Sequence, residues 1–148
     1  MTLDLLTEDK VVVKTSTTDW STAIHEAAQP LINANVINEG YVDAMINSVN
    51  EFGPYIVIAP EIAIAHARPN GDVNEVGLSL LKLKKHVNFS EEGHYASLVF
   101  VLSAVDGQSH LTVLQDLASV LGDKDTVQQL LATQDKAEIL NLLKETDE

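Results

Sequence analysis

Cysteine is absent from the 148-residue chain, which excludes disulfide bonds, thiolate metal ligands and a cysteine nucleophile. Cations are scarce: nine lysine and arginine residues stand against 22 acidic residues, for a formal net charge of -13. Such a charge repels phosphate backbones and anionic lipid, so we expect no nucleic-acid binding. No apolar run reaches the ~20 residues that span a bilayer, and the first residues lack the features of a secretory signal. We therefore predict a cytoplasmic protein with no direct membrane insertion.

Common enzyme motifs are missing as well. The sequence has no glycine-rich phosphate loop, no Gly-x-Ser-x-Gly elbow and no His-Glu-x-x-His pair, which disfavours a nucleotide-binding enzyme and predicts no cofactor. What remains is the composition of an ordinary globular protein, with 45% hydrophobic and 21% charged residues. No linker, repeat or low-complexity tract interrupts it. We expect one domain over residues 1–148.

The hydrophobic pattern predicts an α/β fold. In the expected strand at residues 62–67, Ile62, Ile64 and His66 point one way, while three alanines point the other way. A strand that is apolar on both faces belongs in a sheet covered by helices, so we predict a three-layer α/β/α sandwich with a mixed central sheet. We expect further strands at 11–13, 55–59, 77–83 and 97–104, and helices at 19–28, 41–51, 109–121, 125–132 and 136–144.

His66 is the first candidate for chemistry, because it ends an apolar strand where the chain must leave the sheet. Ligands of open α/β folds bind beyond strand ends. Arg68 lies two positions later, so an extended chain aims its guanidinium to the same side, where it suits a phosphoryl group. On these residues alone, a histidine that simply bonds to the backbone is the simpler interpretation.

His110 is the second candidate, in the first turn of a helix whose predicted N-cap is Ser109. Free N-H groups and the positive end of the helix dipole favour an anion there. A histidine that merely faces solvent is the alternative. The buried stripe of this helix is predicted to consist of Leu111, Leu114, Leu117, Ala118 and Leu121.

The other three histidines carry weaker signals. His25 lies beside Glu26 on a predicted helix, and we assign it no function. His86 and His94 share a polar stretch with Glu91 and Glu92, but their spacing matches no zinc motif. We expect a solvated connection and no metal site.

Residues 59–69 read Ala-Pro-Glu-Ile-Ala-Ile-Ala-His-Ala-Arg-Pro. This segment resembles the active-site segment of enzyme IIA domains of the mannitol and fructose class, from the bacterial sugar phosphotransferase system. Residues 77–83, 87–89, 106–110 and 114–118 look most like the ascorbate-specific branch of that class. Two positions depart from the family pattern: Ala65 replaces a usual proline, and residues 47–50 lack the arginine of mannitol-type members. Our hypothesis is that Arg68 replaces that charge.

The resemblance implies a phosphocarrier. His66 would be phosphorylated on Nε2 by phospho-HPr, with its proton on Nδ1 held by an acceptor, and His110 would lie beside it. Arg68 and Ser109 would stabilise the phosphate. The phosphoryl group would pass to a IIB component, which works with a membrane IIC. The sugar expected from the ascorbate-type resemblance is L-ascorbate. A regulatory protein of the nitrogen phosphotransferase type is the alternative function, and homo-oligomerisation is left open.

Overall fold

A mixed five-stranded sheet forms the centre of the computed structural model, which describes residues 5–68, 71–90 and 93–147. Its strand order is β1-β4-β5-β3-β2. The pairs β1 with β4 and β5 with β3 are parallel, whereas β4 with β5 and β3 with β2 are antiparallel. The strands are β1 (Val11–Lys14), β2 (Val57–Ala59), β3 (Glu61–Ala65), β4 (Gly77–Asn88) and β5 (Tyr95–Ser103).

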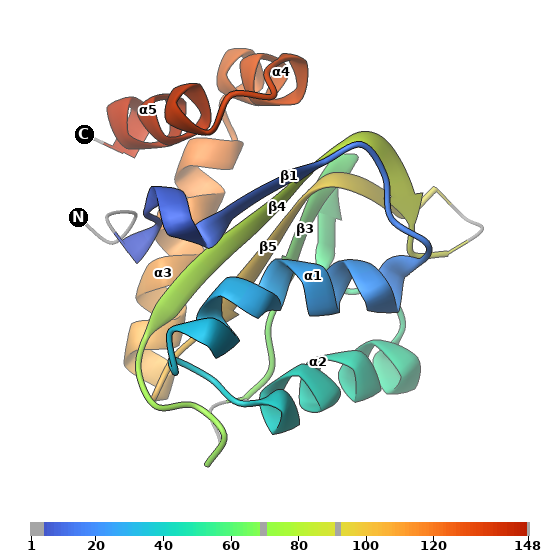
Figure 1. Cartoon of the computed structure of the whole chain (residues 1–148), viewed down its shortest axis with the longest axis vertical. Coiled ribbons are helices and arrows are strands. Elements are labelled where there is room, and N and C mark those ends of the chain that lie inside the picture. Colours follow the sequence, from blue (N-terminus) through green and yellow to red (C-terminus); the bar gives the residue numbers. More distant parts are fainter. Residues whose placement is uncertain (1–4, 69–70, 91–92, 148) are drawn as a thin grey trace.

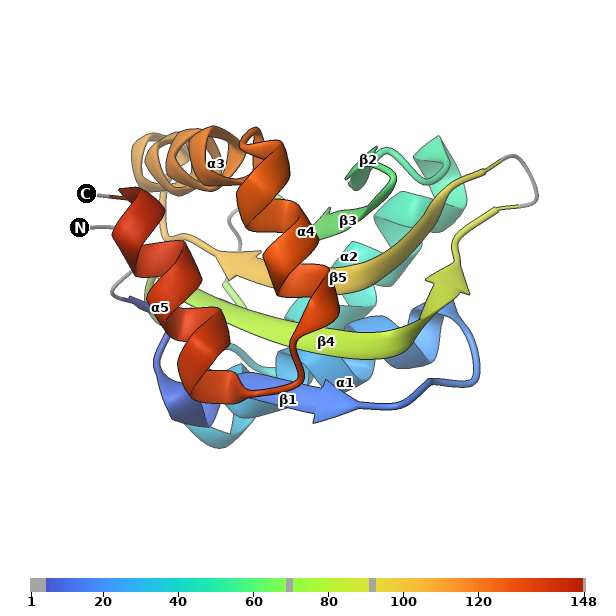
Figure 2. The same ribbon diagram turned by 90° about the horizontal axis from the view of Figure 1, so that it is seen from above.

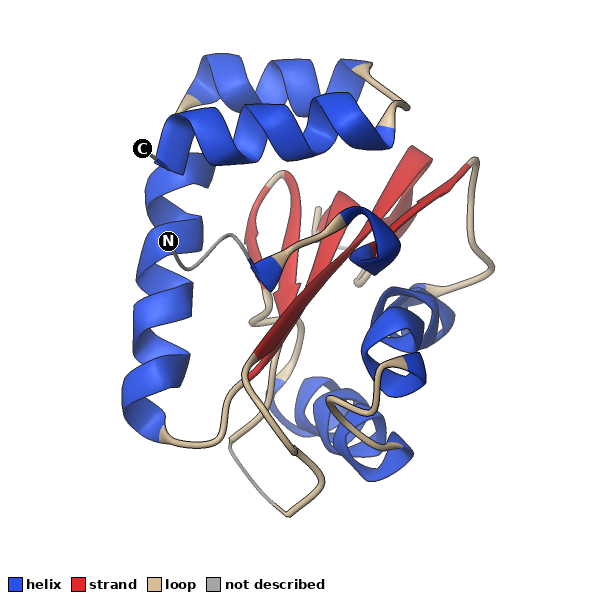
Figure 3. Cartoon of the chain, turned by 60° about the vertical axis from the view of Figure 1, so that its left-hand side comes forward, coloured by secondary structure: helices blue, strands red, loops and turns tan. Residues whose placement is uncertain are grey.

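Helices cover both faces of this sheet (Figures 1 and 2). One face carries α1 (Trp20–Asn33) and α2 (Glu39–Phe52). The other face carries α3 (Gly107–Leu121), α4 (Lys124–Ala132) and α5 (Lys136–Asp147). Figure 3 shows the strands lying between the two groups of helices. The predicted three-layer α/β/α sandwich with a mixed sheet is therefore confirmed.

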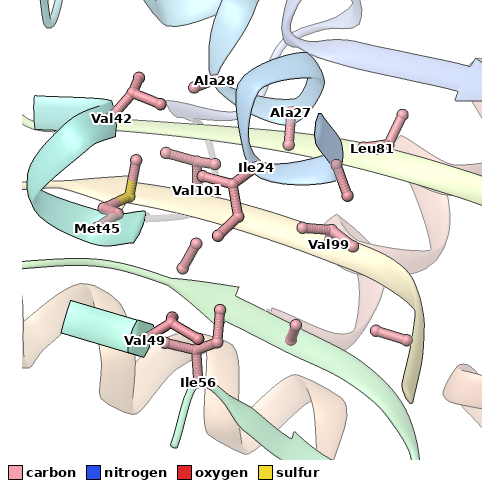
Figure 4. Packing of buried hydrophobic residues seen from close by; sticks show 14 of the residues in the cluster. Ile24, Ala27, Ala28, Val42, Met45, Val49, Ile56, Leu81, Val99 and Val101 are labelled. Atoms are coloured by element: carbon pink, nitrogen blue, oxygen red, sulfur yellow. The ribbon is translucent and has the colours of Figure 1, made fainter. Parts of the chain in front are cut away.

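Two apolar layers fill the space between the sheet and its helices. Ala63 and Ala65 of β3 face α1 and α2, while Ile62 and Ile64 face α3, α4 and α5. This alternation is the one predicted from the sequence, and it follows from the two-residue period of a strand. Figure 4 shows side chains of α1 and α2 packing onto β4 and β5 in the first layer.

The first two helices begin at side-chain caps. The Asp19 carboxylate accepts a hydrogen bond from the Thr22 N-H at 2.8 Å, and Asn38 caps α2 in the same way. α1 was expected to end near residue 28, but it continues through Pro30. Proline lacks an N-H, yet the Pro30 carbonyl still accepts from the Ala34 N-H at 3.1 Å, and Pro30 is buried.

The predicted buried stripe of α3 is partly wrong. Leu117 and Leu121 are buried as expected, but Leu111 is 51% exposed and Ala118 is exposed. Val113 and Val120 complete the buried face instead. The helix starts two residues earlier than expected, and its packing also depends on α5, whose position the sequence pattern does not specify.

Candidate functional site

Strand order brings the two candidate histidines together. β3 and β5 are parallel neighbours, so their carboxyl ends lie at the same edge of the sheet. His66 follows β3 directly, and His110 lies in the first turns of α3, which follows β5. The two imidazole rings meet edge to face, with centroids 5.1 Å apart and planes at 84°.

The His66 ring is oriented by its own strand. Its Nδ1 lies 2.8 Å from the Ile64 carbonyl oxygen. A carbonyl can only accept a hydrogen bond, so Nδ1 carries the proton and donates it. In the neutral ring Nε2 then keeps its lone pair. The geometry thus gives the tautomer that a nucleophilic Nε2 requires.

A cavity of about 700 Å³ opens beside this ring. The half-buried His66 and the exposed Arg68 both line it, as does His110. Ser48 of α2 also lines it. The remaining lining residues are Ala44, Phe52, Tyr55 and Ala67. One guanidinium and two imidazoles therefore share one open cavity that is otherwise lined largely by apolar side chains.

His110 is biased toward its neutral form. Partial burial of the ring, and secondly the nearby His66, lower the pKa of His110 below the usual value for histidine. A neutral imidazole can either donate or accept a hydrogen bond. His110 can therefore contact a phosphoryl oxygen or its neighbouring ring without placing a second positive charge in the cavity.

The predicted N-cap of α3 is wrong: the cap is Asp106, and Ser109 lies in the first turn. The Asp106 carboxylate accepts hydrogen bonds from both the N-H and the hydroxyl of Ser109, each at 2.8 Å. These bonds, that to the N-H foremost, lower the pKa of Asp106. The His110 N-H is also used, since it donates to the Asp106 carbonyl at 3.2 Å. Stabilisation of phosphate by Ser109 stays a prediction. The Ser109 hydroxyl already donates its hydrogen bond to the Asp106 carboxylate.

Tyr55 is a site residue that the sequence pattern did not reveal. We expected it in a strand at 55–59, but it lies in the turn before β2 and is 43% exposed. Its ring meets His66 edge to face, with centroids 5.5 Å apart. A large aromatic residue in the turn before β2, whose partner strand β3 leads into His66, is the signal that could have indicated it.

The other histidines lie outside this cavity. His25 is exposed on α1, and the Nδ1 of His94 pairs with the Ser90 hydroxyl at 2.7 Å. His86 lies 3.6 Å from the Glu61 carboxylate and packs on Tyr95. The metal alternative also involved Glu91 and Glu92, which lie outside the described residues. Among residues 5–68, 71–90 and 93–147, no three His, Asp or Glu side chains are grouped so that they could hold a metal ion.

Comparison with known proteins assigns the chain to a family. Residues 4–146 match the family model described as "Phosphoenolpyruvate-dependent sugar phosphotransferase system, EIIA 2". The chain belongs to this family. As an enzyme IIA component it is a phosphotransferase. In the part of this IIA domain that the structure describes, no helix has the length and apolar character needed to cross a membrane.

Two relatives from Escherichia coli K12 are similar over nearly their whole length. The mannitol-specific cryptic phosphotransferase enzyme IIA component is 31% identical over 140 residues, covering 95% of each chain. The ascorbate-specific EIIA component is 30% identical over 147 residues, covering 97% of this chain and 96% of the relative.

Solved structures of IIA domains share the fold. The solution structure of the mannitol-specific cryptic enzyme IIA from E. coli has a TM-score of 0.89 and 32% identity, over 98% of this chain and 99% of that one. A complex of the E. coli mannitol enzyme IIA with phosphorylated IIB has a TM-score of 0.83 and 23% identity, over 93% and 95% of the two chains.

Proposed function

We propose that this IIA domain is a phosphocarrier that accepts a phosphoryl group from phospho-HPr on His66 Nε2 and donates it to a IIB component. The observation that carries the proposal is the hydrogen bond from His66 Nδ1 to the Ile64 carbonyl. That bond leaves Nε2 as the free nitrogen of a ring that lines an open cavity. A cytoplasmic location follows from such a donor and acceptor.

In the proposed step, Nε2 attacks the phosphorus atom of the donor phosphohistidine. The new N-P bond forms as the old one breaks, and the donor imidazole recovers its electron pair. The His66 ring becomes more positive as its lone pair is shared, and the Nδ1 proton stays in place. The Ile64 carbonyl stabilises that charge, because it accepts a stronger hydrogen bond from a charged donor. Transfer to IIB is the same displacement with His66 as the leaving group.

Charge on the moving phosphoryl group needs compensation, since the chain as a whole is strongly acidic. Arg68 is the cation in the cavity lining, and His110 adds a neutral donor next to His66. Ser48 lies in the α2 segment where mannitol-type members carry arginine. We therefore propose that Arg68 supplies the charge from the segment after the active histidine.

The partner and the sugar are parts of the same proposal. A IIB partner is supported by the complex of the mannitol enzyme IIA with phosphorylated IIB, whose IIA fold this chain shares. L-ascorbate is proposed from the likeness of residues 77–83, 87–89, 106–110 and 114–118 to the ascorbate branch. The two curated relatives, named for mannitol and for ascorbate, are almost equally similar to the chain.

The direct test of the carrier is His66→Ala, assayed with labelled phosphoenolpyruvate, enzyme I and HPr. We expect label on the wild-type chain and a complete loss of label on the variant, because the accepting nitrogen is gone. His25→Ala removes an exposed histidine of α1 and serves as the matched control, with normal labelling expected. Normal labelling of His66→Ala would refute the assignment.

A further inference from the structure

One peptide bond in the site is held at both ends by tyrosine hydroxyl groups. It is the bond between His66 and Ala67. The Tyr55 hydroxyl donates to the His66 carbonyl at 3.2 Å. The Ala67 N-H donates to the Tyr41 hydroxyl oxygen at 3.1 Å. Because a peptide unit is planar, these two contacts restrain its whole plane, and so the backbone that carries the His66 ring.

Tyr41 connects this peptide to the rigid part of the sheet. Its side chain is 1% exposed, and its hydroxyl donates to the Leu102 carbonyl of β5 at 2.8 Å. Burial raises the pKa of Tyr41 to about 12, so the phenol stays protonated and can keep donating. β3 pairs with β5 as far as Ala65, and the phenol then bridges from β5 to Ala67. The strand leaves the sheet at this bridge, beside His66.

Tyr55 holds the other end from the side of the cavity. It lies in the turn between α2 and β2, and its ring meets the His66 imidazole edge to face, with the ring planes at 89°. It therefore touches His66 twice, through the hydroxyl on the main chain and through the ring on the side chain. Tyr41 and Tyr55 are two of the three tyrosines in the chain.

We propose that Tyr41 and Tyr55 are positioning residues for phosphoryl transfer, which clamp the His66–Ala67 peptide and so fix where Nε2 points. The inference rests on the proposed function of His66. Three restraints then act on the histidine: the Ile64 carbonyl on the ring, and one hydroxyl at each end of the peptide. A displacement at phosphorus depends steeply on the placement of the attacking atom, so loosening this peptide slows transfer while leaving the nucleophile intact.

The experiment uses Tyr55→Phe and Tyr55→Leu, because Tyr55 is exposed and its loss leaves the buried core untouched. Tyr95→Phe is the matched control: it removes the third phenol, which packs on His86 away from the cavity. Transfer from phospho-HPr is measured at increasing donor concentration, to separate the maximal rate from the apparent KM. Ring ¹⁵N spectra of His66 in the unphosphorylated chain are recorded in parallel.

For Tyr55→Phe we expect the maximal rate to fall roughly fivefold, the ordinary worth of one hydrogen bond, with an unchanged KM. The spectra should show the Nδ1-H form of His66 exchanging with other states. Tyr55→Leu should lose at least as much rate, and Tyr95→Phe should match the wild type. A Tyr55→Phe chain with the wild-type rate and spectrum overturns the proposal, and so does a loss confined to Tyr55→Leu, which would make the ring alone responsible.

Failure of the carrier assignment would look different. If His66 is not the carrier, His66→Ala keeps its label, whereas the ¹⁵N spectra still report whether the clamp orders the ring. If the Tyr41→Phe variant folds, it tests the buried half of the clamp by the same rate and spectra. If it does not fold, Tyr55→Phe alone decides the proposal.

Discussion

At His66, the orientation of the imidazole comes from a carbonyl only two residues earlier in the chain. The sequence could place this histidine at the end of an apolar strand, with Arg68 beyond it. It could not reveal the bond to Ile64, because that depends on a side-chain rotamer at the point where the strand ends. The simpler interpretation, a histidine bonded to the backbone, describes the same contact that frees Nε2.

Tyrosines show the limit of sequence reasoning at this scale. Tyr41 appeared only as the start of an amphipathic helix, and Tyr55 as a strand residue. Their shared peptide partner lies at the end of a different strand, far from Tyr41 along the chain. Hydrogen bonds between such distant positions leave no periodic pattern in one sequence, so neither tyrosine could be assigned to the site.

His110 gives a pH prediction. Its pKa is lowered in the folded chain, by burial first and by His66 second, so below about pH 6.5 the unfolded state binds more protons than the folded state. The His110 contribution to the free energy of unfolding is therefore constant above that pH and declines as the pH falls toward the folded pKa. In His110→Asn this contribution is absent, so the variant should gain stability relative to the wild type on acidification.

Urea unfolding of both proteins at pH 7.5, 6.5 and 5.5 measures this difference. A gap between wild type and His110→Asn that is the same at all three pH values would contradict the prediction.

Among the elements, strand order decides whether a site exists. Both β3 and β5 were predicted as buried strands, but the sequence does not say that they are parallel neighbours. That pairing places the residue after β3 beside the helix after β5. Local pattern set most element bounds to within a few residues, while the order of strands is a property of the packed molecule.

In α3, the local sequence predicted the helix itself, but not its capping residue or its full buried face. Its predicted cap failed because Asp106 competes with Ser109 for the first turn, and a carboxylate three residues ahead can accept from both Ser109 groups. The stripe of α3 was misjudged at Leu111, which faces solvent.

Asp106→Ala should therefore destabilise α3 and lower the Tm by a few degrees, because the first turn loses its acceptor. Asp106→Asn retains a capping oxygen and should lie close to the wild type. Thermal unfolding followed by circular dichroism measures both. Equal Tm values for Asp106→Ala and the wild type would show that the cap contributes nothing.

At the scale of the whole molecule, composition and net charge excluded classes of function but did not identify one. The absence of cysteine requires that any thiol acceptor of phosphate lie outside these 148 residues. The net charge of -13 favours a partner with a basic docking face, and long-range attraction of this kind accelerates encounter.

The choice of IIB partner is the prediction at this scale. We expect the phosphorylated chain to transfer its phosphoryl group to an ascorbate-type IIB at least tenfold faster than to mannitol-, fructose- or galactitol-type IIB. Quenched-flow transfer from purified phosphoprotein measures the four rates, with His66→Ala as the blank. Equal or faster transfer to the mannitol-type IIB would assign the chain to that branch instead.

The short link between His66 and Ile64 has a consequence for control. Both groups belong to one stretch of three residues, so in the proposed carrier the accepting nitrogen is oriented for reaction before any partner arrives. A carrier whose histidine is always correctly oriented has no conformational step of its own that could limit the rate of phosphoryl transfer. The occupancy of this histidine should then follow the supply of phosphoryl groups from upstream and the demand of IIB downstream.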